Sequence, residues 1–133
     1  MTGIDTNVML RAVLHDDPVQ SPVAAALFRS LTREAPGFIT QVSLAEFYWV
    51  LSRSQRMPRD ECLKVIRSLI ETEVLEFDDG ETVVRALSLA EEGADFADAI
   101  IEGTMNLFGT TETVTFDHDA AERLGWRLLA PSA

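Results

Sequence analysis

Four acidic residues stand at positions where their side chains could act together in chemistry. Asp5 and Asp117 each end a predicted β-strand, and Glu46 and Asp98 lie in the first turns of predicted helices. In a parallel α/β sheet, the carboxyl ends of the strands and the N-termini of the following helices share one edge, where ligands usually bind. Carboxylates gathered at one edge repel each other unless a cation compensates. The pattern predicts a divalent-metal site made by these four acids.

The ligand types indicate which metal such a site would take. Carboxylate oxygens suit Mg²⁺ or Mn²⁺. Zinc is disfavoured because His15 and His118 are the only histidines, and Cys62 has no second cysteine at ligand spacing. Metal ions held by carboxylates can generate a hydroxide, orient it in line and stabilise the leaving oxygen. That is the chemistry of phosphodiester hydrolysis.

Two polar residues beside Asp5 are candidate auxiliary groups. Thr6 and Asn7 can orient a carboxylate or a metal-bound water. Asn7 can equally be the N-cap of the first helix. The sequence leaves these two interpretations of Asn7 open.

Three of the four acids also have a purely structural interpretation. Ser43 and Glu46 fit a capping box, in which Glu46 bonds back to the start of its helix. Asp95 fits a helix N-cap with Asp98 three residues later, and Asp117 fits the cap of the helix that follows it. Taken singly, capping explains the acids about as well as catalysis does. Their shared position at one edge favours the metal site.

The elements that must position these acids alternate along the chain, which is typical of an α/β fold around a mostly parallel sheet. Strands are predicted at residues 2–5, 37–40, 74–77, 113–116 and 127–130. Helices are predicted at residues 7–14, from Ser21 (N-cap) and Pro22, from 43, from 58, at 82–91, at 96–107 and through 124. Several carry an apolar stripe at helical spacing, such as Leu44, Phe47, Tyr48 and Leu51.

Composition describes an ordinary globular chain with an unusual charge. Its 133 residues amount to one domain, predicted to span 1–133. A single cysteine fits a reducing compartment, and we read it as a core hydrophobe. No targeting signal is visible and no apolar run approaches the roughly 20 residues of a membrane span. We therefore expect a cytoplasmic protein that does not contact membranes.

The net charge of −11 argues against a diffuse nucleic-acid surface, because such surfaces depend on Lys and Arg neutralising phosphates. The best local basic patch is Arg53, Arg56 and Arg59, although a solvated helix end explains it more simply than RNA contact. Tyr48 and Trp49 just before it could stack a base, with packing in the core or in a dimer as the favoured role.

The ordered motifs resemble those of PIN-domain proteins. The matching segments are Ile4-Asp5-Thr6-Asn7-Val8, Leu44-Ala45-Glu46, Ala94 to Ile101 around Asp98, and Val114-Thr115-Phe116-Asp117-His118-Asp119. Within that family the chain looks most like the VapC-type ribonuclease toxins of toxin–antitoxin pairs. Each motif is weak alone, whereas four in this order over nearly the whole chain are specific.

The resemblance implies a three-layer α/β/α sandwich with a five-stranded parallel sheet, Mg²⁺- or Mn²⁺-dependent cleavage of RNA, and a homodimer. It also implies an antitoxin whose C-terminal segment occupies the active-site groove. Carried over by position, Asp5, Glu46, Asp98 and Asp117 are the metal-site acids, and Asp119 is an auxiliary. Asp95 is read as the helix cap. Glu102, where the family usually has a small residue, is interpreted as a solvated surface acid, with added negative charge near the metal as the alternative.

Other classes fit less well or remain open. A phosphotransfer receiver needs a lysine in the last strand region, and the only lysine, Lys64, lies in a predicted helix. A haloacid-dehalogenase-type phosphatase needs a second Asp where Asn7 stands. A PIN fold that only binds a partner, or a PIN nuclease outside a toxin–antitoxin pair, remains an alternative.

Overall fold

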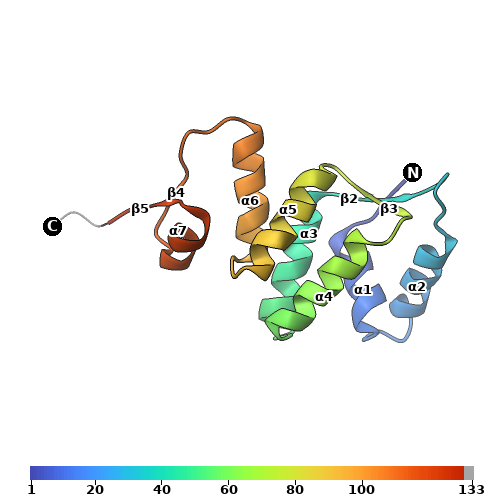
Figure 1. Cartoon of the computed structure of the whole chain (residues 1–133). Helices are drawn as coiled ribbons and strands as arrows, with labels where there is room; N and C mark the ends of the chain where they lie inside the picture. Colours follow the sequence, from blue (N-terminus) through green and yellow to red (C-terminus); the bar gives the residue numbers. More distant parts are fainter. Residues whose placement is uncertain (131–133) are drawn as a thin grey trace. The chain divides into compact units, whose positions relative to one another are not determined.

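The computed structural model describes residues 1–130 and divides into two compact units, residues 1–80 and residues 81–133 (Figure 1). The first unit contains β1 (Thr2–Gly3), α1 (Thr6–Leu14), α2 (Gln20–Ser30), β2 (Gly37–Ile39), α3 (Gln41–Trp49), η1 (Val50–Ser54), α4 (Arg59–Ile70) and β3 (Leu75–Phe77). The second contains α5 (Gly80–Glu91), α6 (Phe96–Leu107), β4 (Val114–Thr115), α7 (His118–Leu124) and β5 (Arg127–Leu128). The boundary between the units falls after Gly80, the first residue of α5. The expectation of one domain over 1–133 remains a prediction.

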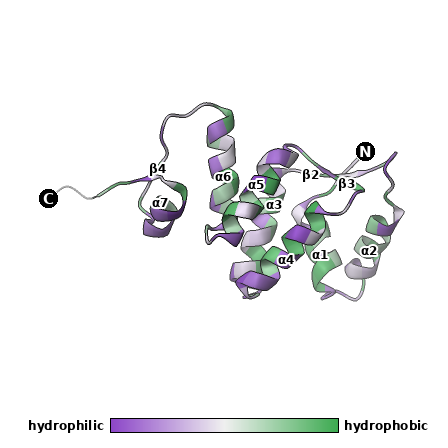
Figure 2. Ribbon diagram, viewed as in Figure 1, coloured by the Kyte–Doolittle hydropathy of each residue, from purple (hydrophilic) through white to green (hydrophobic). Residues whose placement is uncertain are grey.

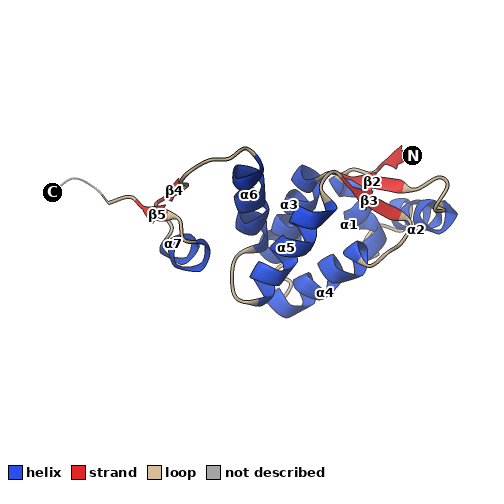
Figure 3. Cartoon of the chain, turned by 45° about the horizontal axis from the view of Figure 1, so that its top comes forward, coloured by secondary structure: helices blue, strands red, loops and turns tan. Residues whose placement is uncertain are grey.

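The first unit is organised by a three-stranded parallel sheet in the order β1-β2-β3 (Figure 3). The central strand pairs Gly37 with Thr2 on one side and with Leu75 on the other. A side chain at residue 37 would collide with the core, since a Cβ there would lie 2.6 Å from Ile4 Cδ1 and 2.9 Å from Leu75 Cδ2. Because all three strands run parallel, the residues that follow them meet at one edge.

Apolar stripes predicted from helical spacing form the core of this unit. Leu44, Phe47, Tyr48 and Leu51 are buried along α3 and the start of η1. The prediction that Cys62 is a core residue is confirmed, since its side chain is buried. Burial raises the pKa of its thiol. Trp49 differs from its neighbour Tyr48, because 53% of it is exposed. Packing of α1 against both α2 and α3 completes the unit.

The start of α2 differs from the prediction that Ser21 is its N-cap. The helix begins at Gln20, and Asp17 Oδ1 accepts hydrogen bonds from the N–H groups of Val19 (2.9 Å) and Gln20 (2.7 Å). Ser21 Oγ reaches back and accepts from the N–H of Asp17 (3.3 Å). The prediction was wrong because a stronger acceptor stood four residues upstream of Ser21.

The second unit has its own short sheet and a smaller core. Strands β4 and β5 pair in parallel, with Val114 opposite Arg127. Phe96, Ala99 and Ile100 are buried on the predicted face of α6, whereas Leu107, expected on the same face, is 66% exposed. Gly103 allows close approach of α5, because a Cβ there would collide with Thr82.

The prediction of one five-stranded sheet is wrong for this structure. All five predicted strands exist, but they form one sheet of three strands and another of two. Alternating or apolar runs indicate that a strand exists and which face it buries. Pairing, in contrast, depends on backbone hydrogen bonds that carry no side-chain signature, and strands of two or three residues constrain it weakly.

None of the helices in the described part of the chain has the length and apolarity needed to cross a membrane. In Figure 2 the labelled helices carry both polar and apolar residues.

Candidate functional site

Asp5 is held at the start of α1 by its own helix. It is the N-cap, and its Oδ1 accepts hydrogen bonds from the N–H groups of Asn7 (3.1 Å) and Val8 (3.3 Å). The alternative in which Asn7 caps the helix is therefore wrong. Asp5 is exposed, and within the described residues its Oδ2 makes no hydrogen bond. One oxygen orients the carboxylate, and the other is available as a ligand.

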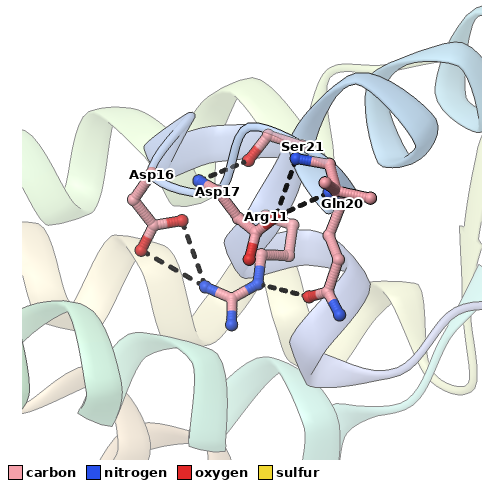
Figure 4. Close-up of polar contacts among 6 residues, drawn as sticks. Arg11, Asp16, Asp17, Gln20 and Ser21 are labelled. Carbon is pink, nitrogen blue, oxygen red and sulfur yellow. Dashed lines mark hydrogen bonds and ion pairs between the residues drawn. The ribbon is translucent and has the colours of Figure 1, made fainter.

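A pocket of about 410 Å³ opens beside Asp5, between α1 and α2. Its walls are largely apolar, with Val8, Val23 and Leu27 contributing. At its polar end, Arg11 pairs with Asp16 (3.1 Å) and donates from Nε to Gln20 Oε1 (2.8 Å), as Figure 4 shows. These bonds join the end of α1 to the start of α2.

Glu46 has no structural role of the kind that the sequence suggested. The N-cap of α3 is Thr40, whose Oγ1 accepts from the N–H of Ser43 (3.1 Å). The predicted capping box between Ser43 and Glu46 is therefore wrong. It requires a helix that begins after Ser43, whereas α3 begins at Gln41. Glu46 lies in the second turn and is exposed. Within the described residues its carboxylate makes no hydrogen bond or ion pair.

The starts of α1 and α3 are joined directly. Thr6 is buried, and its Oγ1 donates to the carbonyl oxygen of Ser43 (3.4 Å). This contact fixes the helix that begins beside Asp5 to the helix that carries Glu46. The predicted role of Thr6 in orienting a carboxylate or a metal-bound water stays a prediction.

Asp78 is a residue that the sequence analysis missed. It follows β3, at the same edge of the sheet where Asp5 follows β1, and its Oδ1 accepts from the N–H of Gln41 (2.9 Å). The first residue of α3 is therefore anchored to the end of β3. The signal that identifies Asp5 and Asp117, an acid directly after a strand, would also have identified Asp78.

In the second unit, the prediction that Asp95 caps the helix before Asp98 is confirmed. Asp95 is the N-cap of α6, and its Oδ1 accepts from the N–H of Asp98 (2.9 Å). Asp98 is partly exposed one turn into the helix. Its assignment as a metal ligand in preference to Asp95 stays a prediction.

Asp117 resembles Asp5 in its local geometry. As the N-cap of α7, it accepts through Oδ1 from the N–H groups of Asp119 (2.8 Å) and Ala120 (3.2 Å). Its Oδ2 makes no hydrogen bond within residues 1–130. Asp119 is an exposed acid in the first turn of α7, near the positive end of the helix dipole.

Glu102 is more than a solvated surface acid. Its Oε2 accepts a hydrogen bond from the indole N–H of Trp126. The contact joins α6 to the segment between α7 and β5. The sequence interpretation was wrong because Trp126 lies 24 residues away and only the fold brings it near.

Each unit thus contributes two of the four predicted acids. Taken by itself and over its described residues, neither unit gathers three carboxylate, imidazole or thiol groups close enough to hold a metal ion. The available donors do suit a hard divalent cation, since Asp5 and Asp117 each keep one unbonded oxygen and Glu46 keeps both. Convergence of all four acids on one site stays a prediction.

A comparison with protein families gives a match to the PIN domain over residues 4–126, which includes parts of both units. Comparisons with curated proteins and with solved structures gave no match.

Proposed function

Because the chain belongs to the PIN-domain family, generally a metal-dependent nuclease fold, we propose that it is an endoribonuclease dependent on Mg²⁺ or Mn²⁺. Asp5, Glu46, Asp98 and Asp117 are its metal-site acids. The observation that carries this assignment is Glu46, an exposed carboxylate without a cap to make or a partner to bind. In the second turn of α3 it is too far from the helix start to gain much from the helix dipole, so its carboxylate is available as a ligand.

The chain's own residues supply orientation and negative charge. Backbone N–H groups at the starts of α1 and α7 hold Asp5 and Asp117 by one oxygen each, so each carboxylate is fixed before a cation arrives. Thr6 and Asp78 fix the start of α3 and with it Glu46. When bound, the metal activates the attacking water and offsets the charge that develops on the phosphate. Asp119 adds a further carboxylate next to Asp117.

The family resemblance extends the proposal to a toxin paired with an antitoxin, acting as a homodimer. The apolar pocket beside Asp5 supports the antitoxin, because it can take apolar side chains of a protein segment close to Asp5. At a net charge of −11, we expect the antitoxin's binding segment to be basic or to carry arginine. Affinity for the antitoxin should then fall as salt rises, and salt-insensitive binding would contradict this part.

The test of the nuclease is cleavage of RNA by the purified full chain with Mg²⁺ or Mn²⁺, with EDTA, and with Glu46→Gln. We expect cleavage that needs the metal and is abolished by Asp98→Ala. Glu46→Gln should reduce the rate by more than the roughly 10- to 100-fold typical of a residue that only supports a metal ligand. Its melting temperature without added metal should stay at the wild-type value, since the Glu46 carboxylate makes no hydrogen bond or ion pair within the described residues.

Two results would decide against the proposal. Full activity in EDTA would exclude a metal nuclease. Absence of cleavage, together with binding of RNA or of a protein partner, would favour a PIN fold that serves only for binding. Expression with and without the neighbouring gene product, followed by sequencing of cleaved RNA ends, tests the antitoxin and identifies the RNA.

A further inference from the structure

The connection from α3 to α4 is built unusually. Helix α3 passes without a break into η1, a π-helix in which the N–H of Gln55 bonds to the carbonyl of Val50 at 3.0 Å, five residues back. The N–H of Met57 then bonds to the carbonyl of Leu51 at 2.9 Å. Single π-turns are rare and occur frequently at functional sites.

A strained residue follows directly. Arg56 has φ = 52°, the left-handed conformation that a side chain normally avoids. That conformation costs roughly 1–2 kcal/mol in a residue with a Cβ. Glycine would remove this cost, yet the chain places an arginine here. The strain and the π-turn together indicate that this segment is shaped for its side chains and not for the stability of the helix.

The segment is also the most basic part of an acidic chain. Residues 47–59 contain no Asp or Glu and hold three of the eleven basic residues, in a protein of net charge −11. Arg53 and Arg56 are exposed, and within the described residues neither side chain makes a hydrogen bond or an ion pair. Arg11, Arg33 and Arg127, in contrast, are each paired with an acid. The guanidinium groups of Arg53 and Arg56 are therefore available to an anionic ligand.

An exposed aromatic side chain lies next to these arginines. Glu46, Trp49 and Arg53 stand at i, i+3 and i+7, all exposed, so they follow one face of the helical segment. Seven helical residues rise about 10 Å. The face therefore leads from a proposed metal-site acid to an exposed tryptophan and then to Arg53, and the exposed Arg56 follows three residues further along the chain.

We propose that Trp49, Arg53 and Arg56, hereafter the Trp49–Arg patch, bind single-stranded RNA of the substrate. Trp49 stacks on an unpaired base, and the two guanidinium groups bind flanking phosphates. Stacking on an aromatic side chain requires an unstacked base, which a loop or a single strand offers and a duplex does not. This patch resolves how so acidic a protein holds RNA, and it rests on the proposed nuclease function for its connection to Glu46.

Binding of RNA is measured with the full chain carrying Asp98→Asn, which prevents cleavage, and a short fluorescent single strand or the corresponding duplex. The variants are Trp49→Ala and Arg53→Ala with Arg56→Ala. The matched control is Arg29→Ala with Arg85→Ala, because these two arginines are also exposed and lie outside the patch, and their removal changes the net charge equally. Fluorescence anisotropy gives the Kd, and a salt series gives its slope.

We expect Trp49→Ala to weaken single-strand binding roughly 5- to 150-fold, the range for loss of one stacked base. Removing both arginines should lower the slope of log K against log salt by about 1.4, or about 0.7 for each lost phosphate contact. The control pair should leave single-strand binding within about twofold of the parent. Tighter binding of the single strand than of the duplex is also expected.

Three results would overturn the inference. One is a Kd unchanged by Trp49→Ala, and another is equal weakening by the control pair. The third is a loss of dimer mass on Trp49→Ala with unchanged RNA affinity, which would assign the face to a second copy of the chain. Cleavage is scored separately with Asp98 intact. If the patch binds RNA but the chain never cleaves it, the proposed nuclease function alone is contradicted. If the chain cleaves RNA at a rate that the patch substitutions do not change, this inference alone is contradicted.

Discussion

At the scale of single residues, the caps and the proposed ligands are the same side chains. Asp5 and Asp117 each use Oδ1 for backbone N–H groups and leave Oδ2 unbonded within residues 1–130. Capping and metal binding are therefore compatible, although for Asp117 the sequence presents them as competing interpretations. The helix fixes the carboxylate, and its second oxygen remains for chemistry.

Substitution by asparagine separates these two roles. Asn caps helices about as well as Asp, because its side-chain oxygen accepts the same bonds. We expect Asp5→Asn and Asp117→Asn to leave thermal stability near the wild-type value while RNA cleavage is lost. Asp5→Ala and Asp117→Ala should each lose cleavage and also about 1 kcal/mol of stability.

Circular dichroism melts and RNA cleavage assays measure the two effects independently. Cleavage by both asparagine variants at the wild-type rate would assign Asp5 and Asp117 to capping alone.

At the scale of elements, acids outside the proposed site determine where helices begin. Asp17 binds the first N–H groups of α2, and Asp78 binds the first N–H of α3. Both lie upstream of, or far from, the helix they anchor. Such anchors locate the pocket beside Asp5 and the helix that carries Glu46.

Asp17 should make the stability of α2 depend on pH. Hydrogen bonds from the N–H groups of Gln20 and Val19, with the nearby charge of Arg11, hold the pKa of Asp17 below its ordinary value of 3.8. A lowered folded-state pKa gives stability that is complete above the ordinary value and is lost as pH falls through the folded value. Asp17→Asn keeps the acceptor and does not titrate. Urea unfolding should therefore show wild type more stable than Asp17→Asn at neutral pH, with the difference shrinking below 3.8. A difference that does not change with pH would refute this.

Asp78 should act on cleavage through the position of Glu46. Asp78→Ala leaves the N–H of Gln41 without its acceptor, which costs about 1 kcal/mol and loosens the start of α3. We expect a lower melting temperature and slower cleavage, with both restored by Asp78→Asn. The same measurements on Glu76→Gln, an exposed acid on β3, provide the control. Slower cleavage that asparagine does not restore would indicate that Asp78 needs its charge, as a direct ligand would.

At the scale of the whole molecule, binding of a divalent ion should stabilise the folded chain. A ligand that binds only the folded state adds about 2.7 kcal/mol at a concentration 100 times its Kd. We expect Mg²⁺ or Mn²⁺ to raise the melting temperature of the wild type by several degrees. Asp5→Asn and Asp98→Asn, one from each unit, should each remove most of this rise. Glu122→Gln, an exposed acid on α7, should keep it.

This measurement does not depend on activity, so it tests the metal site even if the RNA substrate is not the one supplied. An equal rise in all variants would show that ions bind elsewhere on this acidic chain.

The sequence by itself determined which elements exist and which faces they bury. Helical spacing located the buried side of α3, and all five strands appeared within two residues of their predicted positions. It also placed Asp95 and Asp117 at helix starts, because an acid before a helix has a local physical reason to be there. These are short-range properties, which depend on neighbours within a few residues.

Tertiary structure alone decided the long-range contacts. The tertiary structure divides the strands into two sheets. The pairing of β2 with β1 and β3, the bond from Trp126 to Glu102, and the anchoring of Gln41 by Asp78 each join segments more than twenty residues apart. The tertiary structure also shows that α3 is capped by Thr40 in place of the predicted capping box at Glu46, and that a π-turn follows Trp49. Periodicity and composition carry no record of such pairings, because many partners satisfy the same local pattern and only packing selects among them.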